Sequence, residues 1–538
     1  MKKLCPVFIF LFLGILQLHA QNWQELIKLT PTVRDTIGRF GRQVSMSGNY
    51  AIVGALDRYD INNGNPMEGA GSAYIFERDS MGQWNLAQKI VASDRDEWDG
   101  FGWSVSISGN YAIVGAPYED HDLSGMNPLR SSGSVYIFER DLSGHWNQIQ
   151  KITAPERDLE DFFGCSVSIS GNQAVVGAYL DDGNNNSSSG VGCAYIIKRN
   201  STGRWSIMQK LMASDGNGGD KFGWSVSISG QYIIIGARDC GSYDNQGNFH
   251  WGTGAAYIFE QDYTGHWNEV QKISPPTWDQ NRGDSFGGSV SISGNYAIVG
   301  ARFDNNDITP GNEVNNAGSA YIIERDRLGN WSIVQKIVAP NRSEDDLFGN
   351  SVSISDNYAI AGCPFDDKDS TGINPLNNAG AAYIFERNDY GEWNLLQKVV
   401  ASDRAIGDTF GNAVSISDNA IIIGAPFKDA DMNNGNIISD AGSAYIFENE
   451  AMGIFNNIYE LQTKVYPNPT RGEFTIDLGK IYSNITISLS DLSGKNLYER
   501  FLQQTQKIHI FIGNLPAGVY FLNIQSDNKM GSIKLLKR

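Results

Sequence analysis

The stretch FGWSVSISGNYAIVGAPYEDHD, from Phe101 to Asp122, occurs in seven near-copies along this 538-residue chain. The other six begin, at intervals of about 60 residues, at Phe40, Phe163, Phe222, Phe286, Phe348 and Phe410. A fixed period of this length is typical of repeat architectures, in which each copy forms one unit that buries its apolar faces against its neighbours. The fold is therefore expected to consist of seven such units packed side by side.

Each period contains four short segments with the composition of β-strands. In the second repeat they cover residues 104–108, 111–115, 133–139 and 146–152, and they are rich in Val, Ile, Tyr and Phe. The turns at 108–110 and 141–144 are too short for anything but hairpins. Each period predicts a four-stranded antiparallel sheet, and seven such sheets arranged radially predict an all-β, seven-bladed β-propeller.

Two glycine motifs in each period resemble those of a known family. Phe-Gly opens the innermost strand, and Gly-Ala-Pro follows the second strand at 115–117 and 424–426, with Gly-Cys-Pro at 362–364. These motifs resemble the FG-GAP repeats of integrin α-subunit propellers and their bacterial relatives. Other copies depart at the third position, as in Gly54-Ala55-Leu56. The predicted blade does not depend on this third residue, because the Gly-Ala pair is expected to make the tight packing contact.

The outermost strand of each blade is expected to begin with tryptophan, at Trp23, Trp84, Trp146, Trp205, Trp267, Trp331 and Trp393. The first of these precedes the first Phe-Gly pair, whereas the chain offers no such strand after Glu448. We therefore expect the N-terminal segment NWQELIKLT to supply the outer strand of the seventh blade, beside residues 442–448. Such closure removes exposed sheet edges, which otherwise invite aggregation.

Composition and the N-terminus point to an exported, acidic protein. The net charge of -18 disfavours nucleic acid and anionic lipid as partners, and it favours cations or neutral, hydroxylated ligands. Residues 1–20 combine Lys2 and Lys3 with an apolar run and predict a secretory signal peptide, and nothing later resembles a membrane helix. The remaining cysteines lack regular spacing and are expected to be packed free thiols, although two of them share a repeat and have the option to pair: Cys165, Cys193, Cys240 and Cys363.

After the propeller (21–449) and a linker (450–463), residues 464–538 contain strand-like runs between Pro, Gly and Asn turns, which predict a small β-sandwich. Its short motifs contain Pro467, Asn468, Pro469, Gly494, Lys495, Pro516, Gly518, Tyr520, Lys534 and Lys537. They resemble the type A C-terminal sorting domain of the type IX secretion system. The resemblance implies a Bacteroidota-type bacterium and the type IX machinery as a partner. It also implies removal of this domain, with surface attachment or release.

The long loops carry the acidic residues and should share one face, because the second-to-third and fourth-to-first connections of an antiparallel blade lie on the same side. An Asp two residues before Phe is expected to cap its loop, at Asp99, Asp161, Asp220, Asp284, Asp346 and Asp408. Further pairs occur in second-to-third loops at Asp120 and Asp122, Asp367 and Asp369, and Asp429 and Asp431. These pairs leave three interpretations open: loop caps, calcium ligands, or part of a glycan- or protein-binding surface. The third interpretation is compatible with nearby aromatic residues at Trp98, Tyr118, Phe303, Phe365 and Phe427.

The calcium ligands of integrin propellers cannot be transferred to this chain. In that family they lie between the first and second strands, a connection of only three residues here. Enzyme motifs such as Gly-x-x-x-x-Gly-Lys-[Ser/Thr] and His-Glu-x-x-His are absent from the sequence.

We expect a monomeric, secreted or cell-surface binding propeller without enzymatic activity. It should serve adhesion or recognition of a glycan or protein through its acidic face, with calcium as the cofactor to test. The alternative is a secreted polysaccharide lyase or hydrolase on the same scaffold, because paired carboxylates are abundant.

Overall fold

The computed structural model describes residues 23–449 and 459–538, apart from residues 32, 58–59, 63–64, 184–189, 244–248, 277–278, 280–282, 310, 432–436, 461–463, 469, 491–495, 517 and 527–528. The predicted signal peptide, most of the predicted linker, and Pro469, Gly494 and Lys495 lie outside the described residues. Contacts divide the chain into two units, of which one is Trp23–Glu448 and the other includes residues 459–538. In the described part of the chain, no helix is long and apolar enough to cross a membrane.

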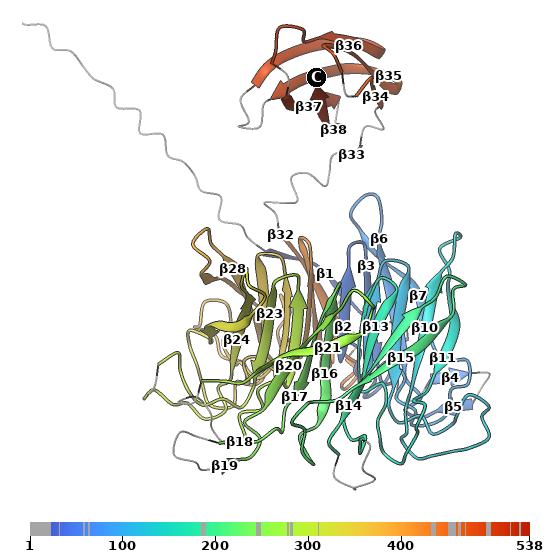
Figure 1. Cartoon of the computed structure of the whole chain (residues 1–538), viewed down its shortest axis with the longest axis vertical. Coiled ribbons are helices and arrows are strands. Elements are labelled where there is room, and N and C mark those ends of the chain that lie inside the picture. Colours follow the sequence, from blue (N-terminus) through green and yellow to red (C-terminus); the bar gives the residue numbers. More distant parts are fainter. Residues whose placement is uncertain are drawn as a thin grey trace, which may run out of the picture. The chain divides into compact units, whose positions relative to one another are not determined.

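The first unit consists of seven four-stranded antiparallel sheets (Figure 1). Their innermost strands are β2 (Gln43–Ser47), β8 (Ser104–Ser108), β12 (Ser166–Ser170), β16 (Phe222–Ser229), β22 (Ser289–Ser293), β26 (Ser351–Ser355) and β30 (Ala413–Ser417). The second strands are β3 (Tyr50–Ala55), β9 (Tyr111–Ala116), β13 (Gln173–Ala178), β17 (Tyr232–Ala237), β23 (Tyr296–Ala301), β27 (Tyr358–Cys363) and β31 (Ala420–Ala425). The third strands are β6 (Ser72–Arg78), β10 (Ser134–Arg140), β14 (Cys193–Arg199), β20 (Ala255–Gln261), β24 (Ser319–Arg325), β28 (Ala381–Arg387) and β32 (Ser443–Asn449). The outer strands are β7 (Trp84–Ile90), β11 (Trp146–Ile152), β15 (Trp205–Leu211), β21 (Trp267–Ile273), β25 (Trp331–Ile337), β29 (Trp393–Val399) and β1 (Trp23–Leu29).

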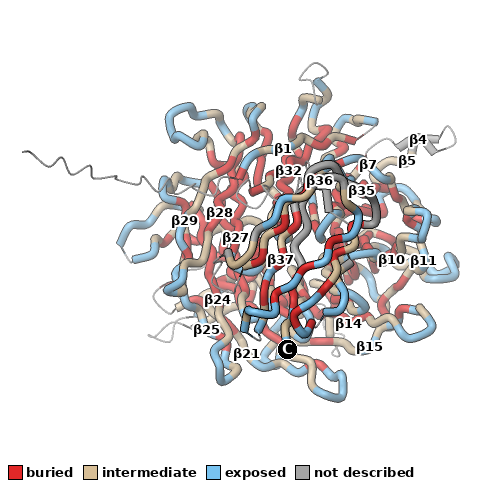
Figure 2. Tube along the Cα trace, turned by 90° about the horizontal axis from the view of Figure 1, so that it is seen from above, coloured by how far each residue is buried: buried red, intermediate tan, exposed pale blue. Residues whose placement is uncertain are grey.

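The sheets are the blades of a propeller. Neighbouring inner strands contact one another all the way round, from β2 through β8, β12, β16, β22 and β26 to β30 and back to β2. In Figure 2 the blades surround a common centre, and exposed turns form the rim. The sheets are not joined into one by continuous hydrogen bonding, because adjacent blades share only isolated bridges such as the one between Gly71 and Phe101. The predicted seven-bladed propeller is confirmed.

The N-terminal strand closes the ring, as predicted. β1 lies beside β32 in the sheet of the seventh blade. Trp23 donates its backbone N–H to Oε1 of Gln397 at 2.8 Å and accepts a hydrogen bond from Nε2 of Gln397 at 2.9 Å. The same exchange joins outer strands elsewhere, between Gln88 and Trp146, Gln150 and Trp205, Gln209 and Trp267, and Gln335 and Trp393. The N-terminal segment therefore completes the seventh blade with the contacts of an ordinary outer strand.

The cores lie between blades. Phe101 is fully buried and meets the rings of Tyr136 and Phe138 edge to face, with centroids 5.4 and 6.0 Å apart. The surrounding cluster combines Ile52 and Ile75 of the first blade with residues of the second. Because each blade buries its faces against both neighbours, no blade has a separate core of its own.

Glycine is required where adjacent blades touch. A Cβ on Gly300, at the end of β23, would lie 2.0 Å from the carbonyl oxygen of Gly349 in the next blade. Gly349 itself has a φ of +82°, which a side chain would strain. The contact recurs at every interface, in the pairs Gly54–Gly102, Gly115–Gly164, Gly177–Gly223, Gly236–Gly287, Gly300–Gly349, Gly362–Gly411 and Gly424–Gly41. This contact explains why the glycine of Phe-Gly and the glycine at the end of the second strand recur in each period.

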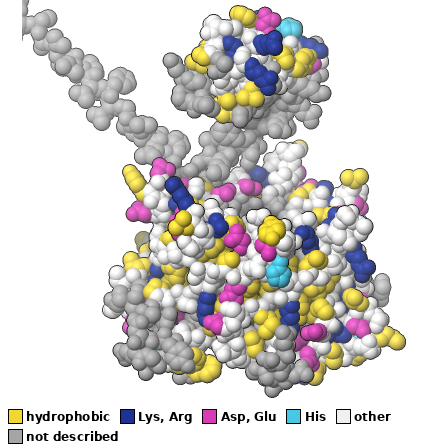
Figure 3. Space-filling model, in the orientation of Figure 1, with side chains coloured by type: hydrophobic (Ala, Val, Ile, Leu, Met, Phe, Trp, Pro, Cys, Tyr) yellow, Lys and Arg dark blue, Asp and Glu magenta, His cyan; other side chains and the backbone are white. Residues whose placement is uncertain are grey.

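Ion pairs join the outer parts of neighbouring blades. The Arg that ends a third strand reaches the Glu of the preceding blade, as in Arg140–Glu77 at 3.1 Å and Arg78–Glu448 at 2.8 Å. At one interface Lys198 replaces the Glu, and there Gln261 replaces the Arg and bonds to Gln173 at 3.1 Å instead. Acidic and basic side chains accordingly lie side by side on the visible wall (Figure 3).

Two small hairpins lie in second-to-third loops, formed by β4 (Asp60–Asn62) with β5 (Asn65–Met67) and by β18 (Ser242–Tyr243) with β19 (Phe249–His250). The four remaining cysteines are free thiols, so Cys165 and Cys193 do not pair.

The second unit contains β33 (Tyr459–Glu460), β34 (Lys464–Tyr466), β35 (Glu473–Ser490), β36 (Asn496–Phe511), β37 (Gly518–Ser526) and β38 (Lys529–Lys537). The sequence predicts a sandwich of two sheets, but the six strands form a single hydrogen-bonded sheet. The long strands β35 and β36 pair along most of their length and so connect the two halves of this sheet. Phe474 and Ile476 from one part of β35 and Ile485 and Ile487 from the other share a single core. The unit is all-β, as predicted.

Candidate functional site: the long-loop face and the channel mouth

The second-to-third and fourth-to-first loops lie on the same side of the propeller, as the antiparallel order of each blade requires. In Figure 1 this is the side on which β4, β5, β18 and β19 lie. Among the described residues, the short hairpin turns lie on the opposite side. We call the first side the long-loop face.

The repeated Asp before Phe-Gly caps its own loop. Oδ2 of Asp99 accepts the backbone N–H of Asp96 at 2.6 Å, and Asp161 and Asp346 make the same bond three residues back, each at 2.7 Å. All three are almost completely buried. Burial raises the pKa of Asp99 to about 8, with a contribution from nearby Glu119, and raises the pKa of Asp161 and Asp346 to about 7. These carboxyl groups hold the loops in place.

A second buried carboxylate in most blades holds a tyrosine and a lysine. Glu119 accepts the hydroxyl of Tyr136 at 2.9 Å and lies 3.4 Å from Nζ of Lys151. In the fifth blade Asp304 binds Tyr321 and Lys336 in the same way, at 2.8 and 2.9 Å. Because the charges are paired inside the blade, this repeated group is part of the scaffold.

The Asp-x-Asp pairs also cap loops. The carboxylate of Asp122 accepts N–H and O–H of Ser124 and Nδ2 of Asn127 at 2.6–2.8 Å, and Asp369 repeats this arrangement with Thr371 and Asn374. Asp120, Asp367 and Asp429 each accept one backbone N–H through Oδ1. The backbone carbonyl of Asp431 accepts Nζ of Lys28 at 2.9 Å.

These hydrogen bonds support the loop-cap interpretation. In the described part of the chain, no three His, Cys, Asp or Glu side chains are placed to hold a metal ion. Calcium binding by the six Asp residues of the pairs stays a prediction.

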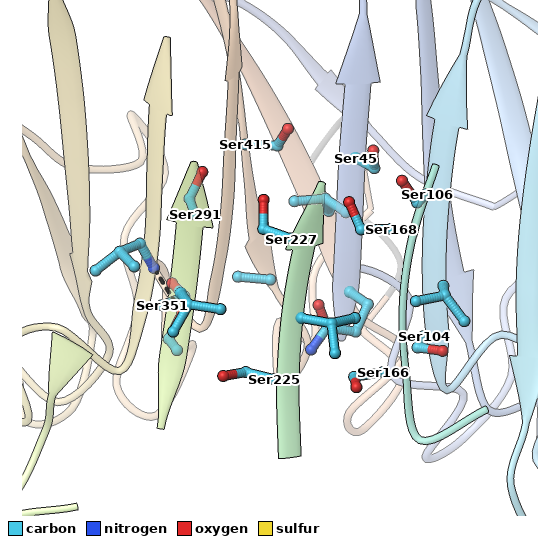
Figure 4. A pocket seen from close by; sticks show the side chains of 18 of the residues that line it. Ser45, Ser104, Ser106, Ser166, Ser168, Ser225, Ser227, Ser291, Ser351 and Ser415 are labelled. Carbon is cyan, nitrogen blue, oxygen red and sulfur yellow. Dashed lines mark hydrogen bonds between the residues drawn. The ribbon is translucent and has the colours of Figure 1, made fainter. Parts of the chain in front are cut away.

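A channel of about 440 Å³ runs between the seven inner strands. A ring of serine side chains surrounds it (Figure 4). One serine of each inner strand, two residues before the strand ends, accepts a backbone N–H of the next blade through its Oγ at 3.1 or 3.2 Å. The pairs are Ser45–Ile107, Ser106–Ile169, Ser168–Ile228, Ser227–Ile292, Ser291–Ile354, Ser353–Ile416 and Ser415–Met46. Among the described residues no acceptor is found for the hydroxyl protons of these seven serines, whereas the serines nearer the mouth, such as Ser104, donate to a glycine carbonyl of the next blade. The channel wall therefore offers hydrogen-bond donors.

The mouth of the channel on the long-loop face breaks the sevenfold repetition. The residue after Phe-Gly differs from blade to blade, as Arg42, Trp103, Cys165, Trp224, Gly288, Asn350 and Asn412. On one side, rings form a continuous row in the order Trp103, Tyr118, Phe162, Tyr179 and Trp224, with successive centroids 4.8–5.5 Å apart. This departure from the repeat is typical of a position used for something other than folding.

Arginines lie at both ends of the aromatic row. The guanidinium of Arg42 lies 3.6 Å above the ring of Trp103, and that of Arg238 lies 3.4 Å above Trp224. Burial lowers the pKa of Arg42 to about 10, and it also lowers the pKa of Arg238 and Arg302. All three stay positively charged at neutral pH. The mouth is thus locally cationic in a protein whose net charge is -18.

A cleft of about 470 Å³ adjoins the mouth, and both are lined by Trp103. The cleft is formed by Ile37, Arg39, Leu56, Gly69, Trp98, Gly100, Trp103 and Tyr118. Trp98 is 59% exposed. A Cβ on Gly69 would lie 2.7 Å from the ring of Trp98, so glycine is needed for this ring to lie flat against the loop. A half-open cleft with an exposed indole is typical of a sugar- or ligand-binding surface.

Two family models match the chain. The model described as FG-GAP repeat matches seven times, at residues 23–76, 84–138, 146–197, 205–259, 267–323, 331–385 and 393–447, and these matches cover more than half of the chain. The chain belongs to the FG-GAP repeat family. Each FG-GAP unit begins with an outer strand and ends in the third strand of the next blade, so the unit of sequence is offset from the blade. No curated protein matches the chain.

The second model, described as secretion system C-terminal sorting domain, matches residues 464–538. This FG-GAP protein is therefore exported by the type IX secretion system to the cell surface or outside the cell, which confirms the predicted localisation.

Several of the predicted sorting residues meet in the second unit. Oδ1 of Asn468 accepts the N–H of Leu536 at 2.9 Å, and Nζ of Lys537 donates to the carbonyl oxygens of Gly513 and Leu515. The hydroxyl of Tyr520 donates to the carbonyl of Pro516 at 2.7 Å. Pro467 and Gly518 are exposed, and Lys534 lies in β38. The basic end thus packs against the Leu-Pro segment, so the motifs stabilise one another.

Sequence reasoning did not find Arg42, Trp103, Arg302, Asn350 and Asn412. All of these except Arg302 directly follow a Phe-Gly pair. The sequence did contain a signal for them, since Phe-Gly is the same in all seven FG-GAP repeats whereas the next residue varies. Of the aromatic residues that were named from the sequence, Trp98 and Tyr118 line the cleft.

Proposed function

We propose that this FG-GAP protein is a secreted or cell-surface binding protein that recognises a glycan in the cleft and mouth of the long-loop face, and that it acts as a monomer without catalysing a reaction. The observation that carries the proposal is the exposed Trp98 beside Trp103 and Tyr118 in one cleft, at a repeat position where the other six repeats have no aromatic residue. Sugars expose flat apolar faces, and aromatic rings with adjacent polar groups bind such faces.

Calcium is proposed as an accessory of the same face. In the described loops, a hydrogen bond is recorded to only one carboxylate oxygen of Asp120 and of Asp367. The second oxygen of each, with loop carbonyls and water, suits a hard cation.

The test is binding of the whole chain to an array of glycans and matrix proteins, with calcium and with a chelator. We expect glycan binding that the substitution Trp98→Ala abolishes. The matched control is Trp251→Ala, because Trp251 is similarly exposed on the same face but does not line the cleft. Binding to proteins alone, or equal binding by the Trp98→Ala variant, would contradict the proposal.

The alternative function, a polysaccharide-acting enzyme, is tested in parallel by incubating the bound glycans with the protein and measuring chain length. Shortening that depends on intact protein would replace the binding proposal by the enzymatic one.

A further inference from the structure

We propose that the channel mouth is an anionic subsite, in which Arg42 and Arg302 bind a carboxylate or sulfate group on a sugar residue while adjoining sugar rings lie in the cleft of Trp98. This inference rests on the proposed glycan-binding function and adds the charge of the ligand. The acidic composition of the whole chain favours cationic or neutral ligands, whereas this subsite would bind an anion.

The first argument is the lack of a carboxylate partner. In the described structure, no Asp or Glu forms an ion pair with Arg42 or Arg302, although the chain contains 60 acidic residues. Other arginines of the propeller either pair with a carboxylate, as Arg140 does with Glu77, or donate to backbone carbonyls of a loop, as Arg157 does to those of Asp120 and Asn127. A half-buried guanidinium without a counter-ion is costly, because burial removes water and nothing of opposite charge replaces it. Two such groups beside one channel are typical of a site that receives an anion.

The second argument is how the arginines are held. Arg42 is stacked on Trp103, which fixes the plane of its guanidinium. Nη1 of Arg302 donates to Oδ1 of Asn350 at 3.1 Å. Asn350 in turn donates to the carbonyl of Asn412 at 3.0 Å, and Asn412 donates to the carbonyl of Arg42 at 3.1 Å. This chain of hydrogen bonds spans the blades between the two arginines, so both are positioned before a ligand arrives.

The third argument is the local balance of charge. Arg238 and Lys221 share the carboxylate of Asp239, at 3.4 and 2.6 Å. Burial lowers the pKa of Arg302, Arg238 lowers it further, and Asp239 raises it. Below the mouth, the serine ring adds hydroxyl protons and no charge. The site therefore has an excess of positive charge and of hydrogen-bond donors, which suits an oxyanion.

The volumes suit a chain of sugars. The channel and the cleft, at about 440 and 470 Å³, each lie within the ~300–1,000 Å³ range of small-molecule sites. Because Trp103 lines both, a glycan in the cleft has its next residue at the mouth. The acidic loops outside the mouth would repel an anion that approached elsewhere on this face, so the charge also fixes where the acidic group binds.

The test is calorimetric titration of the whole chain with oligosaccharides of equal length: oligogalacturonate, a sulfated galactan oligomer and a neutral gluco-oligosaccharide. We expect the neutral sugar to bind at least about tenfold more weakly than one of the acidic sugars, and added salt to weaken only the acidic binding. The two acidic sugars distinguish carboxylate from sulfate as the recognised group.

Arg42→Gln and Arg302→Gln should each weaken acidic binding about 10- to 100-fold, the effect of losing a charge-assisted hydrogen bond, while leaving neutral binding unchanged. Arg327→Gln is the control, because Arg327 is an exposed arginine on a short hairpin turn of the opposite face. If Arg42→Gln does not fold, Arg42→Lys keeps the charge and loses the planar pair of donors, and a loss of affinity is still expected.

Equal binding of acidic and neutral sugars, or wild-type affinity in both arginine variants, would overturn the anionic subsite while leaving glycan binding intact. Failure to bind any glycan would overturn the proposed function as well. Binding of polyglutamate without any acidic sugar would replace the glycan by an acidic protein ligand.

Discussion

Gln397 and Trp23 exchange two hydrogen bonds although 374 residues separate them in the chain. Through them the first strand of the propeller is fixed to the sixth blade, while its other edge pairs with β32 of the seventh. A ring of blades opens if any one contact between neighbours fails, and this contact joins the N-terminal strand to a blade near the other end of the chain.

Gln397→Ala should therefore lower the melting temperature, because it removes both bonds and leaves a half-buried backbone N–H unpaired, at a cost of about 1–3 kcal/mol. Gln271→Ala is the matched control, since Gln271 occupies the same repeat position but bonds to the carbonyl of Lys272. Thermal melting followed by circular dichroism measures the difference. Equal shifts in the two variants would show that ring closure does not depend on this contact.

Gly300→Ala should destabilise the propeller by about 3 kcal/mol, because the new Cβ would lie 2.0 Å from the carbonyl oxygen of Gly349 and must push two blades apart. Gly294→Ala, in the turn of the same blade, meets no atom within 4 Å and bears only the strain of its φ of +55°, about 1 kcal/mol. Denaturant unfolding of both variants compares the two costs. A larger loss for Gly294→Ala would contradict the role given to the glycine contact.

Stability should fall as the pH rises from about 4 to about 8. Burial raises the pKa of Asp99 to about 8 and that of Asp161 and Asp346 to about 7, above the ~3.9 of an unfolded chain. In this window the folded state holds protons that the unfolded state has released, so the free energy of unfolding decreases with pH. Melting temperatures at pH 5.5 and 8.5 measure the slope. Asp99→Asn keeps an acceptor for Asp96 without a titrating group, and an unchanged slope in that variant would refute the assignment to Asp99.

Calcium should raise the melting temperature if the long-loop face binds it, by about 2.7 kcal/mol of stabilisation at a hundredfold excess over the dissociation constant. The shift should become smaller when Asp367 and Asp369 are both changed to Asn. Asp326→Asn is the control, because Asp326 caps a short turn on the opposite face with similar hydrogen bonds. Identical melting of the parent protein in calcium and in chelator would leave the acidic pairs as loop caps alone.

Deletion of residues 464–538 should leave the propeller in the periplasm, since this segment is matched by the sorting-domain model. Cell fractionation with an antibody to the propeller detects the change. The complementary experiment fuses residues 464–538 to a periplasmic reporter, which should then reach the cell surface or the medium. Normal surface delivery of the truncated chain would contradict the assignment.

Much of the fold could be predicted from the sequence because the residues that make each structural contact recur at the same positions in successive repeats. Phe-Gly, Gly-Ala and the leading Trp have fixed spacing, and each makes the same contact in successive blades, so even the offset of Trp23 was readable. The carboxylates of Asp122 and Asp369 could be named but not interpreted, since their partners Ser124 and Thr371 are set by loop geometry. Arg42 and Arg302 could not be assigned to one channel from the sequence, because they lie in different blades and line the same channel only when the ring closes.

The offset between the FG-GAP unit and the blade affects how such a chain can change its length. Each unit contributes its first strand to one blade and its other three to the next. A tandem duplication of one unit would therefore insert a complete extra blade without leaving an unpaired strand at either junction, and the first strand of the chain would still complete the last blade. Propellers of this construction can gain or lose blades by single genetic events, whereas an in-frame copy of part of a unit would leave the ring open.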